Sequence, residues 1–170
     1  MLVQTYPSPI PPGGSGFRYS QSGYTRQDTG GCGFWNADAD WANNTALPKI
    51  NSTVTGAITQ AGITNSKVLD LASTFNGRRL CETGVGLYEE VGIANWTSAG
   101  AVDRTEWVNQ IRTVTTAGDS PYYIQESLHP NYWGGSSPCA AACARRGTPV
   151  RRRAAPACAP RPACSTASRG

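Results

Sequence analysis

A change of composition at Gly134 limits what this chain can fold into. Residues 135–170 contain no Leu, Ile or Phe and consist mostly of Ala, Arg, Pro, Cys, Gly and Ser. Such a segment cannot bury enough apolar surface to offset the entropy lost on ordering, so we expect it to be disordered. The fold is therefore expected within residues 1–134, which is a suitable length for one domain.

The charge of the chain divides at the same place. Residues 135–170 hold seven arginines and no acidic residue, and removing these seven charges from the net charge of +4 leaves −3 for residues 1–134. A basic arm for nucleic acid is one interpretation of this tail. The interpretation we favour is the product of a shifted reading frame, because one choice of codons for residues 135–146, read from its third base, encodes an amphipathic helix. We therefore expect no nucleic-acid partner.

Two of the six cysteines, Cys32 and Cys81, lie in the first 134 residues. In polar, Gly-rich surroundings they suggest a disulfide in an exported protein, with two buried free thiols as the alternative. The tail cysteines have no neighbouring His and no Cys-x-x-Cys pair, so we expect no metal site. No stretch has the length of a membrane span, and the residues after Met1 lack the features of a signal peptide.

Hydrophobic periodicity predicts an α/β protein. We expect strands at residues 2–6, 66–73 and 122–125, helices at 38–61 and 101–114, and an irregular functional loop at 13–36. This alternation implies parallel strands. Asp38 is expected to cap the first helix and Gly62 to end it, with Pro48 breaking it or offsetting its start. Trp41 and Trp107 are assigned to the core.

The only histidine, His129, follows the strand predicted at 122–125. In parallel sheets, catalytic residues gather just beyond the carboxyl ends of the strands. Glu126 could hold one imidazole nitrogen and leave the other to accept a proton from a nucleophile. A purely structural histidine and a solvated loop carboxylate are the alternatives for these two residues.

Four segments add a family resemblance to these patterns: "TGGCGFWNADADWANNT", "FNGRRLCE", "AVDRTEWVNQI" and "ESLHPNYWG". In order and spacing they resemble the C-terminal half of secreted bacterial SGNH (GDSL-type) serine esterases and lipases. The resemblance covers nearly all of residues 1–134. It implies an incomplete three-layer α/β/α, flavodoxin-like sandwich, secretion, and a disulfide at the "NGRRLC" loop.

The resemblance also implies a reaction. His129 would be the general base and Glu126 its orienter, in hydrolysis of a small-molecule, lipid or glycan ester through an acyl-serine, without a metal or cofactor. We expect a monomer. Glu126 stands where the family more commonly has Asp, and some members use a backbone carbonyl in that role.

The nucleophile is the main departure from the family. The Gly-Asp-Ser motif that precedes a helix, and the later Gly and Asn of the oxyanion hole, are not found before residues 2–6, so the chain is expected to begin after them and to be inactive alone. Gly-Asp-Ser does occur at 118–120, but a helix is predicted before it and a strand after it, which is the reverse of the required order. We therefore interpret residues 118–120 as a turn, and a hydrolase that uses Ser120 is one alternative. A non-catalytic carbohydrate-binding module with exposed tryptophans is another.

Overall fold

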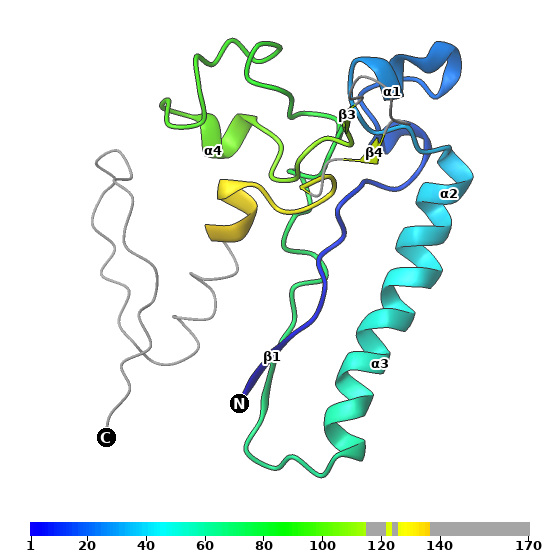
Figure 1. The fold of residues 1–170 in the computed structure, drawn as a ribbon, viewed down its shortest axis with the longest axis vertical. Helices are drawn as coiled ribbons and strands as arrows, with labels where there is room; N and C mark the ends of the chain where they lie inside the picture. The colour runs from blue at the N-terminus through cyan, green and yellow to red at the C-terminus, as the bar shows by residue number, and fades with distance from the viewer. Residues whose placement is uncertain (115–121, 124–125, 137–170) are drawn as a thin grey trace.

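A computed structural model describes residues 1–114, 122–123 and 126–136. The elements, in chain order, are β1 (Leu2–Gln4), η1 (Gly14–Gly16), η2 (Ser22–Tyr24), α1 (Thr25–Asp28), α2 (Asn36–Trp41), η3 (Ala42–Ala46), α3 (Leu47–Gln60), β2 (Lys67–Leu69), α4 (Ala101–Arg104), β3 (Thr113–Val114) and β4 (Tyr122–Tyr123). In Figure 1, α3 runs alongside the extended pair of β1 and β2, and the short helices and strands gather at one end.

The strands β1 and β2 form a parallel two-stranded sheet. Val3 is opposite Val68, and the backbone N–H of Thr5 continues the ladder by donating to the carbonyl of Leu69 at 3.1 Å. Parallel neighbours need a long crossover connection, and α3 lies within the connection between these two strands. The chain is thus of mixed helix and strand with a small parallel sheet, as α/β alternation predicts. The strand predicted at 66–73 is shorter than expected, and Leu69 is the buried residue of β2.

The long helix predicted from residue 38 is present but begins at Asn36, with Trp35 as its N-cap residue and no side-chain cap. The expected role of Asp38 as the cap is therefore wrong. A π-helical segment, η3, immediately precedes Pro48 in the first turn of α3. A wider turn is a reasonable response to proline, which has no N–H to donate and whose ring crowds the preceding turn. Gly62, with φ of +64°, follows the helix end as predicted.

The assignment of Trp41 to the core is wrong. Trp41 is 62% exposed, whereas Ala39, two residues earlier, is completely buried. Two residues correspond to about 200° around a helix, so only one of these side chains can face the core. Trp107 packs as predicted: its ring meets Phe75 edge to face at 6.1 Å, and its Nε1–H donates to a backbone carbonyl at 2.9 Å.

The helix predicted over residues 101–114 is wrong beyond α4. Thr105 is already extended, and Glu106 is buried with its carboxylate accepting the backbone N–H of Cys81 at 2.8 Å. This tertiary contact overrides the local helical pattern. The following residues enter β3, which pairs with β4 in an antiparallel sense, so the parallel arrangement expected for the strand at 122–125 is also wrong.

The core surrounds a disulfide between Cys32 and Cys81, which confirms the predicted pairing. The two Cα atoms are 6.4 Å apart, and both residues are completely buried. The buried core consists of Ile10, Phe17, Cys32, Ala39, Phe75, Leu80, Cys81 and Val108. Gly30 is required beside it, because a Cβ at this position would lie 2.5 Å from the sulfur of Cys81. The helix α3, in contrast, has no buried residue.

Residues 132–136 form one helical turn after the His129 loop. Of the predicted tail, only Gly135 and Ser136 belong to the described part; the expectation of disorder falls on residues 137–170, which lie outside it. Ser120 also lies outside the described residues. Within the part of the chain that the structure describes, no helix is both long and apolar enough to cross a membrane.

Candidate functional site around His129

The loop of residues 126–131 is fixed by backbone hydrogen bonds to the extended segment 106–110. The N–H of Asn109 donates to the carbonyl of His129 at 2.9 Å, and the N–H of Leu128 donates to the carbonyl of Asn109 at 3.2 Å. On the other side, the N–H of Asn131 donates to the carbonyl of Trp107 at 2.9 Å. The peptide units on both sides of His129 are therefore held, although its side chain is exposed.

Leu128 fixes the direction in which the loop turns. Its φ is +62°, in the left-handed region that side chains other than Gly rarely adopt. The Leu128 side chain packs against the hydrophobic core. Burial of this side chain therefore helps to maintain an unfavourable backbone conformation, and strain of this kind is concentrated at functional positions. The side chain of the neighbouring His129 is exposed.

The His129 ring contacts a backbone carbonyl. Its Nδ1 lies 3.3 Å from the carbonyl oxygen of Ser127. A carbonyl oxygen can only accept, so this hydrogen bond requires the proton on Nδ1 and leaves Nε2 of the neutral ring as an acceptor. A histidine in this tautomer is ready to accept a proton at Nε2.

Glu126 lies in the same loop but not against the ring. Its backbone carbonyl accepts the N–H of His129 at 3.0 Å, which closes a turn, and its side chain is exposed. Among the described side chains, no hydrogen bond or ion pair joins the Glu126 carboxylate to the His129 ring. The geometry thus brings Ser127, which the sequence patterns did not single out, to the position expected for the orienting group.

Glu106 is a second chemically unusual residue beneath this loop. Its side chain is 4% exposed, and Oε1 accepts the N–H of Cys81 as well as an Arg18 Nη2–H at 3.1 Å. Burial raises the pKa of Glu106 to about 7; the negative charge of Glu90 acts in the same direction, and the hydrogen bond from Cys81 and the charge of Arg18 oppose it. The second oxygen, Oε2, is buried and has no hydrogen-bond partner in the described structure.

Arg18 connects Glu106 to the loop of residues 86–91. Its Nη2 lies 2.7 Å from Glu90 Oε2, and its Nη1–H donates to the carbonyl of Val85. The Tyr19 hydroxyl donates to the same Glu90 carboxylate. Three segments distant in sequence are therefore joined through one guanidinium group. The helix predicted over residues 101–114 could not anticipate this network, because the Glu106 partners Cys81 and Arg18 are remote in sequence.

A cavity of about 490 Å³, here called the 106–110 cavity, lies between the extended segment 106–110 and the loop of residues 86–89. Asn131, the last residue of the His129 loop, also lines it, and its Nδ2–H donates to the carbonyl of Glu106 at 2.6 Å. A separate cavity of similar volume lies between α3 and the sheet, and none of its lining residues belongs to the His129 loop.

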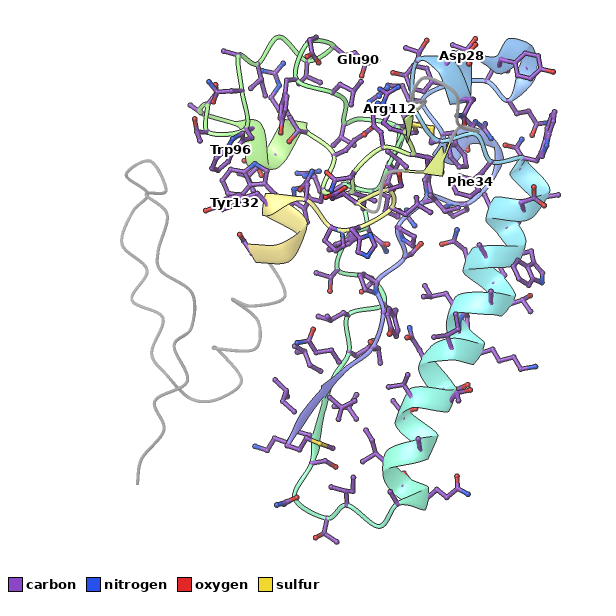
Figure 2. All side chains as sticks on the ribbon, viewed as in Figure 1. Asp28, Phe34, Glu90, Trp96, Arg112 and Tyr132 are labelled. Carbon is purple, nitrogen blue, oxygen red and sulfur yellow. A yellow bond between two sulfur atoms is a disulfide. The ribbon has the colours of Figure 1, made fainter. Side chains whose placement is uncertain are left out.

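A cluster of aromatic side chains also lies near the surface. It is formed by Trp96 and by two residues that follow the His129 loop, Tyr132 and Trp133. The rings of Trp96 and Tyr132 are 4.5 Å apart and tilted by 49°, and Figure 2 shows them next to one another. They are 39% and 42% exposed, respectively. Trp133 packs edge to face against Tyr132.

Comparison with known proteins finds no matching family model, no matching curated protein and no matching solved structure. The geometry of the His129 loop and the resemblance of the motifs are therefore the grounds for a functional proposal.

Proposed function

We propose that residues 1–134 supply the histidine half of a serine ester-hydrolase site of the SGNH type, within an incomplete three-layer α/β/α sandwich. His129 Nε2 accepts the proton of a serine hydroxyl as the serine attacks the ester carbonyl, and the protonated ring then gives that proton to the departing alcohol. Water releases the acyl group from the serine in a second step. The serine and the oxyanion-binding Gly and Asn come from polypeptide outside these 170 residues.

The observation that carries this proposal is the hydrogen bond between His129 Nδ1 and the carbonyl of Ser127. It orients an exposed ring and, in the neutral ring, places the proton on Nδ1 and leaves Nε2 as the acceptor that a general base requires. In this proposal Ser127 orients the ring in the resting protein. The exposed Glu126 carboxylate, in the same loop, stabilises the imidazolium cation that forms during the reaction.

The small parallel sheet supports the proposed sandwich. Parallel sheets are normally covered on both faces and contain more than two strands. The helix α3 and the Val68 side chain are unusually exposed for such a sheet, as expected if further strands and a further layer complete it. The buried Cys32–Cys81 disulfide supports secretion, because disulfides persist in oxidising compartments.

The test is reconstitution with a polypeptide that carries the Gly-Asp-Ser half of an SGNH hydrolase. After complex formation has been confirmed by size-exclusion chromatography, hydrolysis of p-nitrophenyl acetate is measured for the pair. We expect activity that requires His129, with His129→Ala inactive and Ser120→Ala unaffected. Hydrolysis by a stable complex at the same rate with and without His129 would rule out the proposal.

A non-catalytic carbohydrate-binding module is the second candidate. It is favoured by the exposed pair of Trp96 and Tyr132, since exposed aromatic faces suit the stacking of sugar rings. Titration of the chain with soluble polysaccharide, followed by tryptophan fluorescence, tests it. Binding that disappears in Trp96→Ala, in a protein that never gains esterase activity, would favour this candidate over the first.

A further inference from the structure

We propose that the 106–110 cavity binds a sugar ring, and hence that the ester cleaved at His129 is a glycan ester rather than a long-chain lipid ester. The choice of ester rests on the proposed function, whereas the binding of sugar to the cavity does not. Four observations carry the inference: the position of the cavity, its size, the side chains that line it, and polar groups in its wall that have no partner.

The position links the cavity to the chemistry. Segment 106–110, which forms one wall, is the same segment that hydrogen-bonds to the peptide units around His129. Asn131 belongs to both the loop and the lining. His129 itself does not line the cavity, so a molecule bound there would contact the segment that supports the histidine and would reach the ring from beside it. The volume of about 490 Å³ falls within the range of small-molecule sites.

The lining is chemically suited to hydroxyl groups. It contains a phenol, a carboxyl, amides and a guanidinium, from Tyr88, Glu89, Asn109, Gln110, Arg112 and Asn131. In the described part of the chain, Leu87 and Val108 are the only aliphatic residues that line it. A long acyl chain placed here would bury polar groups without hydrogen bonds, which is costly. A sugar offers many hydroxyl donors and acceptors for the same groups.

Two of these polar groups have no hydrogen-bond partner among the described residues. Neither the side-chain amide of Asn109 nor the hydroxyl of Tyr88 makes a hydrogen bond to another described residue. Both side chains are partly exposed, so their polar atoms are open to a molecule in the cavity.

The experiment is an NMR titration of the whole chain with methyl glycosides of glucose, galactose, mannose, xylose and N-acetylglucosamine, and separately with decanoate. We expect at least one glycoside to shift the amide signals of Gly86 and Asn109 saturably, and decanoate to leave them unchanged. Asn109→Ala should weaken the binding roughly tenfold, as expected for loss of one or two hydrogen bonds. Asn44→Ala, an exposed position on η3, is the matched control and should bind normally.

Tyr88→Phe provides a second variant that removes only a hydroxyl group, in case Asn109→Ala perturbs the fold. Shifts caused by decanoate instead of glycosides, or glycoside binding unaffected in both Asn109→Ala and Tyr88→Phe, would overturn the assignment. Failure of the two proposals is distinguishable. If no glycoside binds while reconstituted hydrolysis still requires His129, the sugar site is wrong and the proposed function stands. If glycosides bind but hydrolysis is independent of His129, the sugar site stands and the proposed function is wrong.

Discussion

Replacement of Glu106 by Gln should make the free energy of unfolding depend much less on pH between about pH 4.5 and pH 7. Burial raises the pKa of Glu106 from its ordinary value of 4.5 to about 7. Between these two values the folded chain binds a proton that the unfolded chain does not. The free energy of unfolding contributed by this group therefore falls as the pH rises from about 4.5 through about 7, and is constant above that.

The magnitude follows from the difference between the two pKa values. At 1.36 kcal/mol for each pH unit, it corresponds to about 3 kcal/mol. Because Glu106 is 4% exposed, solvent screening reduces this effect little. Gln does not titrate but retains an oxygen that can accept the N–H of Cys81. Whatever Gln costs in packing is the same at each pH, so the comparison isolates the titration.

The assay is urea unfolding at pH 4.5, 6 and 8, followed by tryptophan fluorescence. Relative to Glu106→Gln, the wild-type chain should lose about 3 kcal/mol between the lowest and highest pH. Glu89→Gln changes an exposed carboxylate in the neighbouring loop and should keep the wild-type slope. Parallel pH profiles for wild type and Glu106→Gln would refute the reasoning, because they would mean that Glu106 is ionised in the folded chain at low pH.

Three further predictions follow from the core and the loop. Replacing Cys32 and Cys81 by Ser should lower the free energy of unfolding by about 4 kcal/mol, because the disulfide closes a loop across 49 residues and so reduces the entropy of the unfolded chain. Urea unfolding measures this loss, and equal stability of the wild-type chain with and without reductant would contradict it. Gly30→Ala should cost about 2 kcal/mol through overlap with the disulfide sulfur, whereas Gly56→Ala, facing open space within α3, should stabilise the chain by about 1 kcal/mol; thermal unfolding of both variants decides whether the clash is real. Long-range ¹H–¹⁵N NMR of His129, the only histidine, should show the neutral ring protonated at Nδ1, and protonation at Nε2 would be incompatible with the loop geometry.

The features of the fold that were predictable are those set by local sequence. A short β-prone run before prolines gives β1, and Gly62 ends the long helix because it adopts φ of +64° at no steric cost. The exposed Trp41 was not predictable, because which face of an amphipathic helix is covered depends on what packs against it. Likewise, the pattern around Glu106 is typical of a helix start, but remote partners decide its conformation.

In the candidate site, too, some features could be predicted from the sequence and others could not. The predicted strand before His129 and the resemblance to SGNH hydrolases together singled out this histidine. Glu126 was singled out by its spacing from His129, which is that of the motif the segment resembles. The sequence could not show that the turn closed by Glu126 brings the carbonyl of Ser127 to the ring instead, since a backbone group leaves no signal in the identity of a residue.

The most direct test of the central claim is the rate at which a fluorophosphonate labels the serine of the Gly-Asp-Ser polypeptide in complex with this chain. The reagent reacts with a serine only when a base removes its proton. If His129 is that base, the wild-type chain should accelerate labelling by about 100-fold or more over His129→Ala, in the range of general-base catalysis. Equal rates for the two chains, or a label found by mass spectrometry on Ser120, would contradict the account.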